Sequence, residues 1–193
     1  NDGTGTFVVV VGGTQGAYPD ASIHLVDLDG DGDLDLAAPS RLLANDGAGT
    51  FAPFLSQPSS GDRMAIADFD GDGDLDLVYG SDSQSVPLSM FFNDGAAVFS
   101  PSTTVLPTDV RKAYELHAAD LDSDGDTDLL QIFGRFTRLL LNDGAGNLVE
   151  APDAIGEKVR LASRGTIGDV DGDGDDDIIL GGGFGSPKVY RNL

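Results

Sequence analysis

The chain has 193 residues, with 33 acidic residues against 11 basic ones and a formal net charge of −22 at pH 7. Nucleic-acid phosphates are bound by lysine and arginine, so this composition argues against nucleic-acid partners. There is no cysteine to form a disulfide, and no apolar run reaches the roughly 20 residues that membrane insertion requires. The length predicts one domain over residues 1–193.

The first predicted element is a strand over residues 6–11. It follows the turn sequence Asn-Asp-Gly-Thr-Gly at residues 1–5. In the later copies of this turn sequence a strand precedes it, and the strand that would precede residue 1 is found at residues 189–192. The strand over residues 6–11 is therefore expected to complete the C-terminal part of the fold, in the same chain or in a neighbouring copy.

The next elements are four copies of one acidic motif. They read DLDGDGDLDL from Asp27, DFDGDGDLDL from Asp68, DLDSDGDTDL from Asp120 and DVDGDGDDDI from Asp169. Carboxylates at positions one, three, five and nine, with glycine at position six for a sharp turn, suit the hard cation Ca²⁺. Without a cation the crowded carboxylates would repel one another, so folding and metal binding should be coupled.

Each loop is predicted to bind one Ca²⁺, giving four sites. Positions one, three, five and nine would contribute side chains, and position seven would contribute its backbone carbonyl. In chain order these residues are Asp27, Asp29, Asp31 and Asp35 with Asp33; Asp68, Asp70, Asp72 and Asp76 with Asp74; Asp120, Asp122, Asp124 and Asp128 with Asp126; and Asp169, Asp171, Asp173 and Asp177 with Asp175. A solvated acidic turn is the alternative, but fourfold repetition at identical spacing favours calcium.

Short apolar runs follow the loops and predict buried strands. They cover residues 36–38, 77–79, 129–132 and 178–180. An EF-hand loop would instead require an acidic residue at position twelve and flanking helices. Position twelve is occupied by Ala38, Tyr79, Gln131 and Leu180, which excludes an EF-hand.

A second repeated sequence, Asn-Asp-Gly, occurs downstream at residues 45–47, 93–95 and 142–144. It predicts a tight hairpin turn, after which a strand restarts near Phe51, Phe99 and Leu148. The repeat length of about 48 residues accommodates four short strands, as a propeller blade requires. The sequence therefore predicts an all-β fold, a β-propeller of four blades with one calcium loop in each.

The pairing of DxDGDGDxDL with NDGxGxF resembles the FG-GAP and VCBS repeats of bacterial surface proteins, and the loops are similar to those of integrin α-subunit propellers. This resemblance covers essentially the whole chain and implies a calcium-binding β-propeller. Ser123 replaces a glycine of the pattern, and Leu148 replaces a phenylalanine. Such propellers serve adhesion, sugar binding and enzyme scaffolding, so the resemblance does not specify an activity.

Several closures fit this repeat pattern. The strand over residues 6–11 can close a four-bladed ring within one chain, or it can be exchanged between chains and so drive self-assembly. A half-ring that pairs into eight blades, and a segment of a seven-bladed propeller, also fit the pattern.

Outside the repeat consensus, His24 and His117 each lie three residues before a calcium loop, as a candidate metal or acid–base pair. Residues 111–115 and 133–138 concentrate positive charge and are candidate contacts for an acidic glycan or another subunit. No group of residues predicts catalysis. We therefore expect a non-enzymatic module for adhesion, binding or assembly, with other protein subunits or extracellular glycans as partners.

The alternatives are the propeller scaffold of a polysaccharide-active enzyme such as a lyase, and a glycan-binding lectin. Calcium loops of extracellular modules bind with dissociation constants of about 10⁻⁴ to 10⁻³ M, which suits a calcium-rich exterior. An extracellular location, secreted or at the cell surface, is therefore expected.

Overall fold

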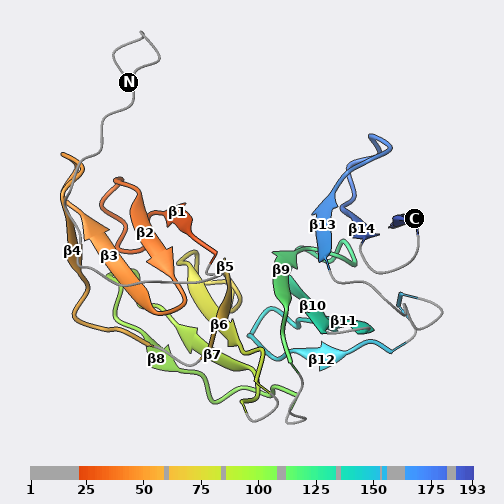
Figure 1. Cartoon of the computed structure of the whole chain (residues 1–193), viewed down its shortest axis with the longest axis horizontal. Coiled ribbons are helices and arrows are strands. Elements are labelled where there is room, and N and C mark those ends of the chain that lie inside the picture. Colours follow the sequence, from red (N-terminus) through yellow and green to blue (C-terminus); the bar gives the residue numbers. More distant parts are fainter. Residues whose placement is uncertain are drawn as a thin grey trace, which may run out of the picture.

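The computed structural model describes residues 22–58, 61–83, 86–107, 112–133, 136–152, 154–155, 164–181 and 186–193. Within these residues all regular structure consists of β-strands, arranged in four antiparallel sheets (Figure 1). The predicted all-β fold is confirmed, and the predicted strand over residues 6–11 lies outside the described residues. No helix that is long and apolar enough to cross a membrane occurs in the described part of the chain.

Each sheet is built from strands that are consecutive in the chain. Sheet 1 contains β1 (His24–Val26), β2 (Asp35–Ala38), β3 (Arg41–Asn45) and β4 (Phe51–Pro53); sheet 2 contains β5 (Arg63–Ala67), β6 (Asp76–Gly80), β7 (Ser89–Phe92) and β8 (Ser100–Pro101); sheet 3 contains β9 (Glu115–Ala119), β10 (Asp128–Phe133), β11 (Phe136–Leu141) and β12 (Val149–Glu150); sheet 4 contains β13 (Arg164–Gly168), β14 (Asp177–Gly181) and β15 (Lys188–Tyr190). The strands of each sheet pair in chain order, which is the up-and-down topology expected of a propeller blade.

The second strand of each sheet begins at position nine of an acidic loop and carries the predicted apolar run. β6 is buried along its whole length, and β10 is buried except at its last residue. Successive side chains of a strand point to opposite faces, so these two strands are covered on both sides. The four predicted buried strands are therefore confirmed as β2, β6, β10 and β14.

Three hydrophobic clusters hold the four sheets together. One packs Leu28 and Leu42 of sheet 1 against Leu77 and Tyr79 of sheet 2. The next joins sheets 2 and 3, and the third joins sheets 3 and 4. Within β6, Leu77 and Tyr79 face sheet 1 whereas Val78 faces sheet 3. Each central strand thus contributes to two interfaces through its two faces.

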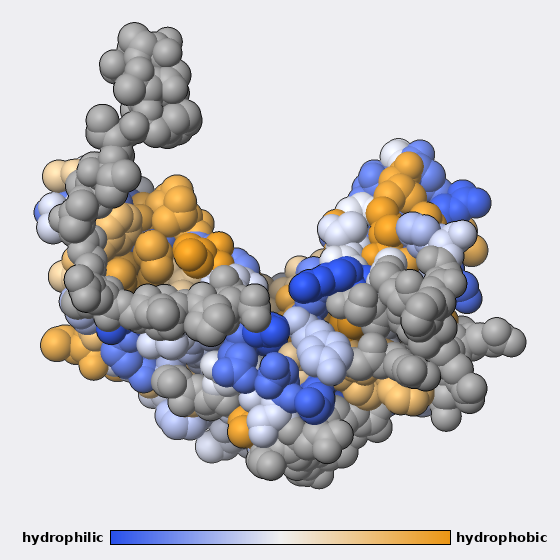
Figure 2. Space-filling model, in the orientation of Figure 1, coloured by the Kyte–Doolittle hydropathy of each residue, from blue (hydrophilic) through white to orange (hydrophobic). Residues whose placement is uncertain are grey.

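The sheets follow one another along an arc, with β1, β5, β9 and β13 on its inner side (Figure 1). β9 contacts both β5 and β13. A closed ring of four sheets needs four interfaces, whereas the described residues form three clusters. The space-filling view shows the resulting opening between sheet 1 and sheet 4 (Figure 2). The arrangement is propeller-like, and in the described residues it is an open arc.

The Asn-Asp-Gly sequences lie in the predicted hairpin connections. Asn45 pairs with Phe51, which leaves five residues between the paired strands. The Asp46 carboxylate accepts hydrogen bonds from the backbone amides of Ala48 and Thr50, and Gly47 and Gly49 have φ values of 73° and 82°. The carboxylate and the left-handed glycines stabilise this loop.

The asparagine of this sequence also links neighbouring sheets. The Asn93 side-chain amide donates to the Leu28 carbonyl (2.8 Å), and the Asn142 side-chain amide donates to the Phe69 carbonyl (2.8 Å). Asn192 donates in the same way to Leu121 (3.3 Å). Each accepting carbonyl belongs to the acidic loop of the preceding sheet. An asparagine and an acidic loop therefore meet across each of the three interfaces between the described sheets.

We predict that Asn142→Ala destabilises the protein by about 1–3 kcal/mol more than Asn45→Ala, because only Asn142 supplies a donor to a carbonyl of a preceding sheet. Both asparagines donate to a carbonyl of their own sheet and accept an amide of their own hairpin, so Asn45→Ala is the matched control. Urea unfolding of the single chain in calcium measures the difference. Equal losses would show that the bond between sheets contributes nothing.

Candidate metal centres

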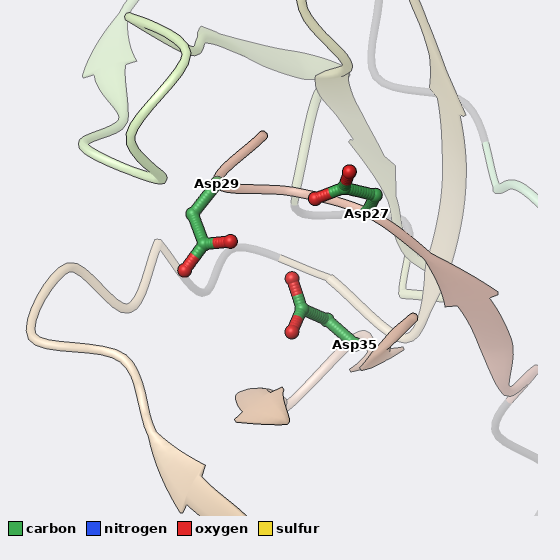
Figure 3. A group of neighbouring side chains, drawn as sticks. All are labelled: Asp27, Asp29 and Asp35. Atoms are coloured by element: carbon green, nitrogen blue, oxygen red, sulfur yellow. The ribbon is translucent and has the colours of Figure 1, made fainter. Parts of the chain in front are cut away.

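Three aspartates converge in each acidic loop, at positions one, three and nine. They are Asp27, Asp29 and Asp35; Asp68, Asp70 and Asp76; Asp120, Asp122 and Asp128; and Asp169, Asp171 and Asp177, and within each triad the ligand oxygens lie within 4.8 Å of one another. Figure 3 shows the first triad, in which Asp27 and Asp29 come from the loop and Asp35 from the start of β2. Among the described residues, these four triads are the only places where three or more potential metal-ligating side chains converge.

The aspartate at position one shapes the loop. Asp27 accepts hydrogen bonds from the backbone amides of Gly30 and Gly32, both at 2.9 Å. Gly32 at position six has a φ of 90°, a conformation that side chains disfavour. In the third loop Ser123 occupies the left-handed region with a φ of 62°, where the other loops have glycine. These contacts turn the chain back so that position three faces position nine.

The aspartate at position nine is buried and joins two segments of its sheet. Asp35 accepts hydrogen bonds from the amides of Leu28 (2.9 Å) and Asn45 (2.8 Å), one on each carboxylate oxygen. Asp76, Asp128 and Asp177 make the equivalent pairs of bonds. Burial raises the pKa of Asp76 and of Asp128 to about 6, although their amide donors act in the opposite direction. The sequence predicted these residues as ligands and did not predict this structural role.

The aspartate at position three has the environment of a cation ligand. One oxygen of Asp29 and one of Asp70 are buried without a hydrogen-bond partner among the described residues. Burial, followed by the charges of neighbouring aspartates, raises the pKa of both carboxyls and of Asp122. A buried, unpaired carboxylate oxygen is costly unless a cation neutralises it. Donor type, convergence and desolvation therefore fit a hard cation such as Ca²⁺.

Positions five and seven lie outside the converged triads. At position five, Asp31 instead accepts a hydrogen bond from the amide of Asp33 (2.8 Å). The other three loops repeat this bond. The predicted metal ligation by these two positions stays a prediction for Asp31, Asp33, Asp72, Asp74, Asp124, Asp126, Asp173 and Asp175.

The position-seven side chain has a contact that sequence reasoning missed. A Cβ atom added to Gly47 would lie 2.5 Å from the Asp33 carboxylate, and one added to Gly95 would lie 2.7 Å from that of Asp74. Gly144 faces Asp126 in the same way. The glycine of each Asn-Asp-Gly sequence thus makes room for the acidic loop of its own sheet.

The two histidines belong to separate sheets. His24 lies on β1 and His117 on β9, with sheet 2 between them (Figure 1). Burial lowers the pKa of His24. His117 contacts Glu115 (3.3 Å), which also pairs with Arg164 (2.8 Å). Neither histidine joins a metal-ligating group of three among the described residues.

The prediction that residues 133–138 form a basic loop available to a ligand is wrong for Arg138. This residue lies in β11, is buried, and donates to Gln131 on the paired strand (2.7 Å). Its second partner is Glu150 at 3.5 Å. Arg138 is therefore part of the sheet and does not reach out towards a ligand. Arg111 and residues 134–135 lie outside the described residues.

The fold and the triads define a propeller-like repeat protein with acidic, metal-competent loops, and the comparisons agree. Residues 68–130 match the family model of the FG-GAP-like repeat, so the resemblance to FG-GAP repeats is confirmed for this part of the chain. No curated protein matches the chain.

Eleven chains of known structure match it. One is a lectin of Agrocybe aegerita, described as recognising non-reducing terminal N-acetylglucosamine, with a TM-score of 0.55 and 23% sequence identity. The match covers 86% of the present chain and 50% of the lectin chain. The present chain thus spans about half the length of that lectin and shares its fold.

We predict that the effect of Asp70→Asn depends on calcium. In excess chelator the variant should be as stable as the wild type or more stable, because one of three converging charges is removed. In millimolar calcium it should fall below the wild type by up to about 1.4 kcal/mol, the linkage value for one site at about ten times its dissociation constant. Denaturant unfolding in both buffers tests this.

Asp74→Asn is the matched control for this experiment, because it removes a charge from the same loop but from a side chain outside the triad. Its effect should be small and equal in both buffers. If Asp70→Asn behaves like Asp74→Asn, position three does not ligate calcium.

Proposed function

We propose that this chain is a calcium-stabilised, non-enzymatic module of the extracellular space that serves adhesion, binding or assembly. The observation that carries the proposal is the fourfold recurrence of one converged aspartate triad in a chain of net charge −22. A buried oxygen without a partner in two of the triads adds support.

Calcium would act on folding and not on chemistry. A cation bound only by the folded loops stabilises the native state by mass action, by about 1.4 kcal/mol per site at about ten times the dissociation constant. Four such sites would contribute about 6 kcal/mol, which matches the lower end of the whole stability of an ordinary domain, about 5–15 kcal/mol. Loops with dissociation constants of about 10⁻⁴ to 10⁻³ M fill in the extracellular space and stay largely empty in cytosol, which supports an extracellular location.

The absence of a catalytic role is also proposed. Outside the acidic loops, Glu115 contacts two other titratable side chains, His117 and Arg164. Glu115 accepts from both partners and from the Gly165 amide (2.7 Å). Burial alone would raise the pKa of Glu115, but these hydrogen bonds outweigh it and lower the pKa. A carboxylate committed in this way is a structural link between sheets 3 and 4 and a poor general base.

For the partner we favour a glycan, with another protein subunit as the alternative. The shared fold with a lectin described as recognising terminal N-acetylglucosamine supports this choice. Propellers bind ligands through loops carried on a rigid scaffold, and calcium would supply that rigidity here.

Removal of calcium should lower the melting temperature and the strand signal in circular dichroism, and calcium should restore both. Magnesium should restore less, because it requires a small octahedral site. Sodium chloride at matched ionic strength controls for simple screening of the acidic surface. If sodium chloride restores folding as well as calcium does, the loops are solvated acidic turns and the proposal fails.

The calcium-loaded protein should bind a subset of glycans on an array that includes terminal amino sugars and acidic sugars, and chelation should abolish the binding. The dependence is expected because calcium orders the loops and not because the ion contacts the sugar. Isothermal titration with the best glycan checks the stoichiometry. If the folded, calcium-loaded protein binds none of them, a glycan is not its partner.

A further inference from the structure

Equivalent residues form the two faces of every sheet. The face towards the preceding sheet is built by residues such as Met64 and Leu77 in sheet 2, which pack on sheet 1. The corresponding residues of sheet 1 are Ile23, Leu25 and Leu36, here called the leading face. Leu25 and Leu36 are register partners across β1 and β2. In the described residues no sheet precedes sheet 1.

The leading face is apolar and open at its inner end. Ile23 is 67% exposed, whereas its equivalents Met64 and Leu116 are 3% and 8% exposed within interfaces. Leu25 is also exposed, and Leu36 is half-buried. Side chains that are buried in the other repeats therefore lack a covering sheet here.

The opposite face of sheet 4 also has apolar side chains without a covering sheet among the described residues. Val170, Ile179 and Val189 form this trailing face, and Ile179 and Val189 are register partners. Val170 is 47% exposed, whereas the residues at the same loop position, Leu28, Phe69 and Leu121, are at most 6% exposed. Val189 is 54% exposed, against 2% for its equivalent Met90. Hydrophobic side chains gather on both arms of the opening (Figure 2).

In the described part of the chain, the hydrogen bonds that link neighbouring sheets also lack a partner at the two ends of the arc: a donor on the leading face and an acceptor on the trailing face. In the inner interfaces an asparagine donates to the carbonyl at loop position two of the preceding sheet, as Asn142 does to Phe69. Asn45 on the leading side donates, among the described residues, to its own sheet at Leu34 (3.1 Å). Val170 holds the equivalent carbonyl on the trailing side. An Asn45 amide can therefore donate to a Val170 carbonyl if the two faces meet.

We propose that a second copy of this chain docks head to tail, with its leading face on the trailing face of the first. The two faces are complementary because they repeat the surfaces that already pack together at three interfaces within the chain. A heterologous contact of this kind closes if the arc of each copy is half a ring. The arc covers half of a lectin chain of the same fold, so two arcs supply the span of that whole chain.

Sedimentation velocity on the full chain in millimolar calcium tests the proposal. The wild type should form a species of twice the 19.9 kDa mass of one chain. Val189→Asp should raise the dissociation constant more than about tenfold, because a charge would be buried in the contact. Val149→Asp is the matched control, since Val149 is a strand valine of similar exposure in sheet 3. It should leave the association unchanged.

Leu25→Asp should weaken the association as Val189→Asp does, from the other face. An equal mixture of the two variants should regain a two-chain species, because the first keeps its trailing face and the second keeps its leading face. Circular dichroism in calcium verifies that each variant is folded. A contact of like faces would not show this rescue.

A single-chain mass for the calcium-loaded wild type at every accessible concentration would overturn the proposal. Association that survives Val189→Asp, or variants that fail to complement each other, would overturn it as well. None of these results bears on the calcium dependence of folding, so the failure of this inference and the failure of the proposed function are distinguishable.

Discussion

The structure depends on a buried carboxylate at the start of the second strand of each sheet. Asp35 illustrates it: one oxygen accepts the amide of Leu28 at the start of the acidic loop, and the other accepts the amide of Asn45 at the end of β3. These charge-assisted bonds offset much of the cost of burial. The remaining negative charge lies beside two further carboxylates, so the same interaction that fixes the loop also creates the demand for a cation.

The stacking of sheets follows from the alternation of side chains along the central strands. In β10, Leu129 packs towards sheet 2, whereas Leu130 and Ile132 pack towards sheet 4. A strand that is apolar on both faces is stable only between two neighbours. Each sheet therefore depends on the next, as in other repeat proteins whose stability is a sum of nearest-neighbour interfaces. The terminal sheets keep one unsatisfied face each, because the described residues supply no fifth sheet.

The sequence was sufficient for the features that a single repeat determines. The loop spacing and the apolar runs predicted the second strands and the aspartates at positions one, three and nine, which converge, but they also predicted the aspartate at position five, which lies outside the triads. Features set by contacts between repeats or between paired strands were not predictable. Arginine is typical of exposed loops, but the strand register places Arg138 opposite Gln131, to which it donates a hydrogen bond. The bond from Asn142 to Phe69 spans 73 residues. The sequence did not predict whether the sheets close into a ring, because a closed ring and an open arc have the same local sequence pattern.

The candidate metal sites and the interfaces between sheets are physically coupled through loop position two. Leu28 lies between the ligand positions occupied by Asp27 and Asp29, yet its side chain is buried against sheet 2 and its carbonyl accepts the Asn93 amide. Phe69 and Leu121 likewise have a side chain buried against the next sheet and a carbonyl that accepts an asparagine amide from it. A cation that orders the loop therefore also orders a side chain and a carbonyl of the next interface. By the same reasoning, calcium in the fourth loop would hold Val170 in the position required to receive another sheet.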